Sequence, residues 1–319
     1  MIKTIFCCLL LLTSFAGVLE TAQAQTNEIK VTLLGTGCPP PVMNRFGPSI
    51  LVEAGNKKFL FDAGRGAMQR LLQIGVRWQD VEGVFFTHLH SDHVVGFPDL
   101  YLTGWLFVPG RSLPLRVWGP RGTTDMISHI EQAFAFDVHI RELDEHVSPE
   151  GARIIAKDIE EGVVYDEGGV KITAFEVDHG LVKPAFGYRV DYGKRSIVLS
   201  GDTRFSENLI EHSRGVDLLV HEVIAPDSLR RLGIPPERLK AIVARHTTPE
   251  KAADVFNATK PRLAVFSHIA DPTASEQEII PPTRLTYAGP LELGEDLMVI
   301  EVGEKISVRR PKRAATTLN

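Results

Sequence analysis

Three histidines and one aspartate lie close together in residues 87–93, which read THLHSDH. The segment follows an apolar run at 84–86 that predicts a buried strand, and it precedes a pattern at 96–100 that predicts the start of a helix. In an extended chain His88 and His90 point to the same side, so they can share one metal ion. Asp92 and His93 face elsewhere once the chain turns, so they can serve a second ion. Imidazole with carboxylate favours zinc, manganese or iron.

Four later apolar runs, each predicted to be a strand, also end in residues able to bind a metal or orient a ligand. These ends are Asp178-His179, Gly201-Asp202, His221-Glu222 and Ser267-His268. A single histidine at a sheet edge is usually structural, and the role of His221 stays open. This many ionisable strand ends exceed what packing explains, because burying such groups without a metal costs several kcal/mol each.

Alternating strands and helices must position these residues. Strand-like runs recur from Ile29 to Val308, and helix-like runs lie between them. One helix is expected to be capped by Thr123 or Thr124, with Ile127 and Phe134 on one face. The order of elements predicts an α/β fold with sheets in the middle and helices outside.

The N-terminus has the features of a secretory signal peptide. Lys3 precedes an apolar run at 5–12, and Ala22-Gln23-Ala24 is a small-residue cleavage site. Residues 1–24 are therefore expected to direct export to the periplasm or exterior and to leave no stable membrane anchor, because the run is too short for a good membrane span. Cleavage would leave Cys38 as the only cysteine, so no intramolecular disulfide can form.

The remaining chain reads as one domain at 28–310, followed by a short disordered tail at 311–319. We find no internal repeat and no Gly/Ser-rich or Pro-rich linker. The formal net charge of the 319-residue chain is −5, which gives no basic footprint for a polyanion. Nucleic acid is therefore expected to be an unlikely partner.

Together these motifs resemble the metallo-β-lactamase superfamily, and within it the ribonuclease Z and arylsulfatase-like branch. The likeness runs from about Ile29 to Ile269. Its most specific pieces are HxHxDH at 88–93, PAFGYR at 184–189, GDT at 201–203 and HTT at 246–248. The resemblance implies a four-layer αββα sandwich with the metal site at one edge of its two sheets.

The resemblance also implies a role for each candidate residue. One ion would be held by His88, His90 and His179, a second by Asp92, His93 and His268, with Asp202 bridging them. Two Zn²⁺ ions per chain, or Mn²⁺ or Fe, would share a hydroxide that Asp92 orients. His246 would protonate the leaving group with Glu222 orienting it, and Asp62 would hydrogen-bond a ligand histidine. The four remaining histidines, His129, His139, His146 and His212, are expected at the surface.

Two departures from ribonuclease Z shape the expected function. Enzymes of that kind that act on tRNA usually carry a long arm before the GDT motif, whereas only residues 189–200 separate Tyr188 from Gly201 here. The second departure is the signal peptide, since tRNA precursors are cytosolic. The sequence therefore predicts an exported dinuclear zinc hydrolase of small sulfate or phosphate esters, arylsulfatase-like, with a small anionic ester as substrate.

Three alternatives stay open. One is a ribonuclease Z-type 3′-tRNA-processing endoribonuclease or phosphodiesterase, because the core motifs are shared. Another is a lactonase or β-lactamase, although β-lactamases generally have cysteine in place of Asp202 and lack His93. The third is a non-catalytic metal-binding protein. A homodimer fits the resemblance, because this branch is often dimeric, and loops 38–48 and 101–114 carry no readable substrate signature.

Overall fold

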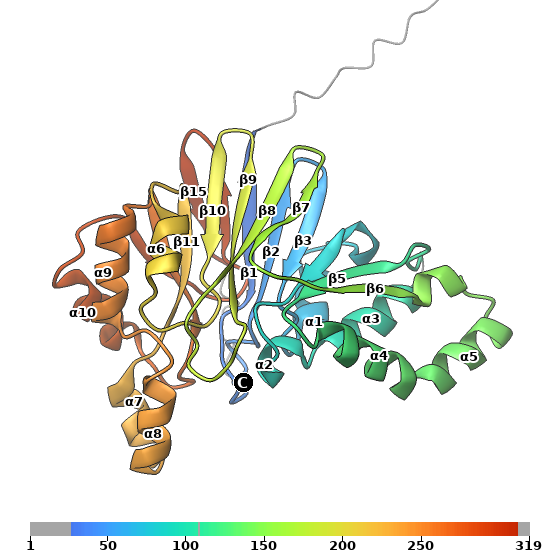
Figure 1. Cartoon of the computed structure of the whole chain (residues 1–319), viewed down its shortest axis with the longest axis horizontal. Helices are drawn as coiled ribbons and strands as arrows, with labels where there is room; N and C mark the ends of the chain where they lie inside the picture. The colour runs from blue at the N-terminus through green and yellow to red at the C-terminus, as the bar shows by residue number, and fades with distance from the viewer. Residues whose placement is uncertain (1–26, 108, 312–319) are drawn as a thin grey trace, which may run out of the picture.

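The computed structural model describes residues 27–107 and 109–311, arranged as two stacked sheets with helices outside (Figure 1). The predicted signal peptide at 1–24, and all but Pro311 of the predicted tail, lie outside these residues. Within the described chain, no helix combines the length and apolarity that a membrane span requires.

One sheet has eight strands in the order β15-β14-β1-β2-β3-β4-β5-β6. Its strands are β1 (Ile29–Gly35), β2 (Ser49–Ala54), β3 (Lys57–Phe61), β4 (Gly83–Phe85), β5 (Leu115–Gly119), β6 (Ile154–Asp158), β14 (Val299–Val302) and β15 (Ile306–Arg309). The second sheet has seven strands in the order β13-β12-β11-β10-β9-β8-β7. These are β7 (Gly162–Glu167), β8 (Val170–Glu176), β9 (Phe186–Tyr192), β10 (Arg195–Leu199), β11 (Leu218–Val223), β12 (Leu263–Ile269) and β13 (Leu291–Leu293).

Three apolar layers hold the sandwich together. The inner faces of both sheets meet in one core that includes Phe59, Phe85 and Tyr188. Helices α1 (Ala67–Gln73), α3 (Phe97–Leu106) and α4 (Thr123–Ala133) pack on the outer face of the first sheet. Helices α6 (Glu207–Ser213), α9 (Pro249–Thr259) and α10 (Ile280–Arg284) cover the second. The predicted αββα architecture is confirmed.

The start of α4 differs from the prediction. The N-cap residue is Gly122, and no side chain caps the helix. The N–H groups of Gly122 and Thr124 instead donate to the carboxylate of Asp158, at 3.1 and 2.8 Å. A distant carboxylate thus does the work expected of a local threonine.

Three further helices were not among the elements expected from the sequence. Helix α5 (Ala135–Asp144) has no buried residue, and α7 (Pro226–Arg231) and α8 (Pro236–Val243) are short. In Figure 1, α7 and α8 extend below the sheets, at the same end of the sandwich as α2 (Ser91–Val94).

The strand directions explain why that end carries the candidate residues. Strands β3, β4 and β5 are parallel neighbours in the first sheet, and β10, β11 and β12 are parallel neighbours in the second. The carboxyl ends of parallel strands meet at one edge of a sheet, so residues that follow them converge there.

Candidate metal centre

The HxHxDH motif spans a strand end and the first turn of a helix. His88 and His90 lie in the loop after β4, and Asp92 and His93 lie in α2. The loop thus presents one pair of side chains before the turn and another pair after it, as the spacing predicted.

Strand β9 fixes this loop from the opposite sheet. The Tyr188 hydroxyl donates to the Phe86 carbonyl at 2.7 Å, and the Phe186 N–H donates to the Thr87 carbonyl at 2.9 Å. Both bonds are made by the PAFGYR segment. The sequence analysis identified this segment as part of the family motif without a physical reason for its residue types, and these two bonds provide one.

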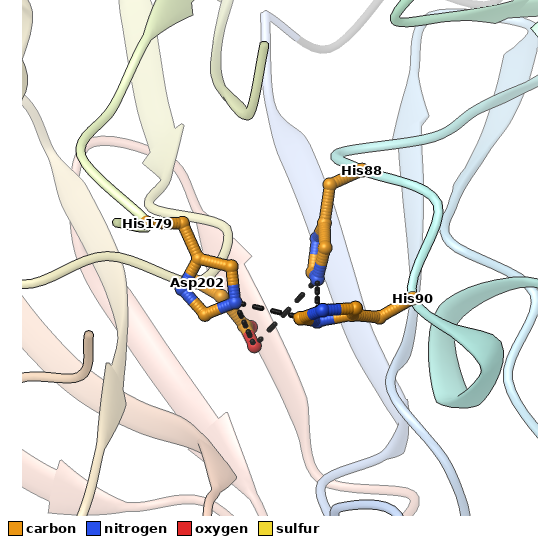
Figure 2. A group of neighbouring side chains, drawn as sticks. All are labelled: His88, His90, His179 and Asp202. Carbon is orange, nitrogen blue, oxygen red and sulfur yellow. Dashed lines mark hydrogen bonds and ion pairs between the residues drawn. The ribbon is translucent and has the colours of Figure 1, made fainter. Parts of the chain in front are cut away.

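A first group of donor atoms comes from His88, His90, His179 and Asp202 (Figure 2). The His90 Nδ1 lies 2.9 Å from the His88 Nε2 and 3.3 Å from the His179 Nε2. The Asp202 Oδ2 lies 3.9 Å from the His88 Nε2 and 3.8 Å from the His179 Nε2.

A second group comes from Asp92, His93 and His268, and it also faces Asp202. The Asp92 Oδ2 lies 3.6 Å from the His93 Nε2 and 3.4 Å from the His268 Nε2. The other oxygen of Asp202, Oδ1, lies 3.5 and 3.3 Å from the same two nitrogens. One carboxylate therefore turns one oxygen to each group.

Hydrogen bonds behind the two groups fix the orientation of the rings. The Asp62 Oδ2 lies 2.7 Å from the His93 Nδ1, and both oxygens of this carboxylate also accept from Thr87. The His179 Nδ1 lies 3.0 Å from the Arg245 carbonyl oxygen. Each bond leaves the opposite nitrogen, Nε2, facing the site. Asp62 and His268 have φ of 59° and 38°, in the left-handed region of backbone conformation. Residues other than glycine adopt this region at an energetic cost, often at functional sites.

His246 and Glu222 form a pair beside the second group. The His246 Nδ1 lies 3.1 Å from the Glu222 Oε1, which also accepts the N–H groups of Thr203 and Thr247 at 3.1 and 3.2 Å. Burial lowers the pKa of His246 to about 4. Burial, and then the charge of Asp202, raises the pKa of Glu222 well above its usual range.

The two donor groups differ in charge balance. Burial lowers the pKa of His88 and His90, and it lowers that of His179 to about 4, which keeps these rings neutral as metal ligands require. In the second group burial opposes protonation, but nearby carboxylates outweigh it. They raise the pKa of His93 well above its usual range and that of His268 to about 9. The carboxylates of this group need positive charge beside them. Protonated imidazoles or a bound divalent ion can provide that charge.

The donor set fits a divalent metal. Buried polar atoms without a hydrogen-bond partner cost about 1–3 kcal/mol each, and His93 Nε2 and Asp202 Oδ1 are two such atoms. A tetrahedral ion with bonds of about 2.0–2.1 Å would place its ligand atoms about 3.3 Å apart. The closer donor pairs in these groups lie 2.9 to 3.9 Å apart, and nitrogen with carboxylate oxygen suits zinc, manganese or iron.

The other histidines do not join the site. His129, His139 and His146 are exposed, and His212 is half-buried with its ring stacked on Phe175. His221 is fully buried, and its Nδ1 lies 2.7 Å from the Glu222 carbonyl oxygen. The fold therefore gathers every predicted site residue at one edge and leaves the remaining histidines outside the two donor groups.

A cavity of about 300 Å³ opens beside both groups. It is lined by His90, Asp92, Asp202, His246 and His268, and by residues of α7, α8 and the turns that follow these helices. Two arginines also line it, Arg238 in α8 and Arg245 just after the helix, and the sequence analysis missed both because neither belongs to a motif. Their seven-residue spacing is no helical signal, since Arg245 lies beyond Val243, the last residue of α8.

Comparisons with known proteins define the class. The Beta-lactamase superfamily domain matches residues 57–269. The chain is 34% identical to a ribonuclease Z of Mycobacterium sp. (strain KMS), over 88% of this chain and 99% of that one. It is 37% identical to a ribonuclease Z of Mycobacterium avium (strain 104), over 86% and 98%. The human short-form tRNase Z shares its fold, with a TM-score of 0.60 at 23% identity, over 86% and 99%.

A four-layer sandwich of this family, with clustered imidazole and carboxylate donors, is a hydrolase that acts on ester bonds and uses a divalent metal. The chain belongs to the metallo-β-lactamase superfamily and, within it, to the ribonuclease Z branch.

Two expectations from the sequence are wrong. The relatives at 34–37% identity over most of the chain are ribonucleases Z, which overturns the arylsulfatase-like assignment. The same relatives contradict the expectation that nucleic acid is an unlikely partner. That expectation rested on net charge and on a missing arm, and a whole-chain charge does not report where basic residues gather.

Proposed function

We propose that this protein is a metal-dependent endoribonuclease of ribonuclease Z type, which hydrolyses a phosphodiester bond in an RNA precursor. The observation that carries the proposal is the shared carboxylate. Asp202 turns one oxygen to each of two donor groups at the wall of one cavity, within a chain of the ribonuclease Z branch.

The residues that would hold the metal follow from the two groups. His88, His90 and His179 would bind one divalent ion, and Asp92, His93 and His268 a second, with Asp202 between them. Zinc is the ion we propose, with manganese or iron as the alternatives that this donor set also suits. Bound ions would lower the pKa of water and neutralise charge on phosphate oxygens.

The chain's own groups divide the remaining work. Asp62 and the Arg245 carbonyl hold the rings of His93 and His179 with Nε2 toward the site. Asp92, beside the cavity, can accept a proton from the attacking water. His246 lines the cavity and can give a proton to the departing oxygen, while Glu222 holds its Nδ1. The negative charge of a bound phosphate would favour the protonated form of His246 and so oppose the effect of burial on its pKa.

The test is cleavage of a tRNA precursor that carries a 3′ trailer by metal-loaded protein. We expect one endonucleolytic cut, lost in Asp202→Ala. Turnover of bis(p-nitrophenyl) phosphate runs in parallel as a check on the loaded centre. Protein that hydrolyses this small diester but leaves every RNA intact would contradict the proposal.

We also propose that residues 1–24 direct export and are removed after Ala24, on the sequence features described above. Mass spectrometry of the protein made in a bacterial host measures the new N-terminus. Recovery of an intact N-terminus from the cytosolic fraction would contradict this proposal and place the RNA substrate in the same compartment as the enzyme.

A further inference from the structure

The segment that carries α7 and α8 is basic in an otherwise acidic protein. Residues 226–245 hold five basic side chains and two acidic ones, whereas the whole chain has a net charge of −5. The basic residues are Arg230, Arg231, Arg238, Lys240 and Arg245, and the acidic ones are Asp227 and Glu237. In Figure 1 this segment, which we call the α7–α8 hairpin, hangs below the sheets at the end where α2 carries Asp92 and His93.

One face of the hairpin looks into the cavity that holds the candidate metal centre. Arg238, Ala241 and Ile242 of α8 line it at the i, i+3 and i+4 spacing of one helical face, and Arg245 lines it from the turn just after the helix. Asp92, Asp202 and His268 line the same cavity. The two arginines therefore border the same cavity as the carboxylates that would hold the metal.

Unlike Arg230 and Arg231, the two arginines that line the cavity have no carboxylate partner in the described chain. Arg230 pairs with Asp227, and Arg231 pairs with Glu278 at 2.7 Å. In the described chain neither Arg238 nor Arg245 lies within 4.0 Å of a carboxylate, and the buried Nε of Arg245 has no hydrogen-bond partner. Neutralising Asp92 or Asp202 is therefore not their role, and they stay available to an anion from outside the chain.

The other residues that the hairpin contributes to the cavity are aliphatic, namely Leu229, Leu232, Ile234 and Ile242. Together with Pro39 and Pro40 from the loop after β1, they form an aliphatic wall. Such a surface can hold a base or a ribose by contact, but it offers no side-chain donors or acceptors with which to distinguish one base from another.

We propose that the α7–α8 hairpin is the RNA-binding element of this protein, an inference that rests on the proposed ribonuclease function. Arg238 and Arg245 bind phosphates that flank the scissile one, and the aliphatic wall receives the adjoining nucleoside. Guanidinium groups suit this task because their planar donors match phosphate oxygens in pairs.

The proposal accounts for RNA binding without a long arm. Strands β9 and β10 are joined only by Gly193 and Lys194, so no extended segment leaves the sandwich there. The backbone contacts then come from the hairpin, which already borders the cavity.

The experiment compares Arg238→Gln and Arg245→Gln with Lys240→Gln as the matched control. Lys240 lies on α8, is exposed, and does not line the cavity. Hydrogen bonds to charged groups contribute about 1.5–3 kcal/mol, so each arginine variant should raise KM for the RNA about 10–100-fold. For Arg238→Gln, which removes no bond to a candidate ligand, kcat and turnover of bis(p-nitrophenyl) phosphate should change less than about threefold.

Salt dependence separates a phosphate contact from a structural role. Each arginine variant should lower the slope of log KM against log salt concentration by about 1. Arg245→Lys, which keeps the charge, should restore most of that slope. Lys240→Gln should stay within about threefold of the wild type in every measurement.

The outcomes that overturn the inference are distinct from failure of the proposed function. RNA cleavage that is unchanged in both arginine variants, or equally impaired in the Lys240 control, overturns the inference alone. Wild type that cleaves no RNA overturns the proposed function. Fluorescence anisotropy of a labelled RNA oligonucleotide on the metal-loaded protein then decides the inference: weaker binding by the arginine variants only supports it, and equal binding by all variants overturns it.

Discussion

A substitution of His246 can distinguish a role in proton transfer from a role in metal binding. If His246 protonates the departing oxygen, His246→Ala should slow substrates with a basic leaving group by about 10²–10⁴-fold. A nitrophenolate leaves without a proton, so a nitrophenyl nucleotide diester should lose much less. The measurement is kcat on that diester and on a dinucleotide with a ribose leaving group, for wild type and variant.

Metal content provides the control, because His246 also falls in a donor group with Asp202 and His268. Elemental analysis of His246→Ala should match the wild type. Loss of metal, with equal losses on both substrates, would make His246 a ligand and would remove its role as proton donor.

His221 should make the protein more sensitive to acid. Its folded pKa is lowered to about 4 by burial, against about 6.5 in an unfolded chain. As pH falls below 6.5 the unfolded state therefore takes up a proton that the folded state refuses, and stability decreases. Between pH 7 and 5 the wild type should lose about 2 kcal/mol more than His221→Leu. Denaturant unfolding at both pH values measures this, and parallel losses in the two proteins would show that His221 already ionises when folded.

Residue types and spacing were enough to nominate the candidate ligands, because strand ends followed by His or Asp are visible without coordinates. The partners of those residues were not visible. The bond from the Tyr188 hydroxyl to the Phe86 carbonyl joins residues 102 apart in the sequence, and no local pattern reports so distant a contact. Arg238 and Arg245 were missed for a related reason, since isolated arginines in or next to a short helix are typical of an ordinary solvated surface.

At the scale of elements, strand β9 is the support on which the metal-binding loop rests. Tyr188→Phe keeps the ring packed against Phe61 and Phe85 but removes the donor to the buried Phe86 carbonyl. Leaving that acceptor unpaired should lower the free energy of unfolding by about 1–3 kcal/mol. Thermal and urea unfolding of the two proteins check this. Equal stability together with unchanged metal affinity would mean that the loop keeps its position without the Tyr188 hydroxyl bond.

The long elements were predictable and the short ones were not. Helix α9 buries Ala252, Val255 and Phe256, whose spacing along the sequence is that of one helical face. Helices α5 and α8 were missed; both have an amphipathic pattern, but neither buries a residue. The same lack of burial hid the basic hairpin, and this is why the net charge of −5 was read as evidence against RNA.

At the scale of the whole molecule, the candidate metal centre joins the two sheets. His88 and His93 follow a strand of the first sheet, whereas His179, Asp202 and His268 follow or end strands of the second. A ligand that binds only the folded state at 1,000 times its Kd stabilises it by about 4 kcal/mol. Removing the metal with a chelator should therefore lower Tm by roughly 10 °C.

The control for metal removal is Asp202→Ala, which takes away the carboxylate shared by both groups. Its Tm should respond little to the chelator, and its metal content should fall. A wild-type Tm that is insensitive to chelation, in protein shown to be loaded, would mean that the folded state gains nothing from the ions.

The order of the donor residues along the chain also has a consequence for biosynthesis. The first donor group is complete once Asp202 has left the ribosome, but the second must wait for His268, which follows 66 positions later. At about 5–20 residues per second, that interval lasts roughly 3–13 seconds. For that time the nascent chain has every member of the first group, three imidazoles and one carboxylate, whereas the second group still lacks His268. During synthesis, the two candidate metal sites are therefore completed one after the other.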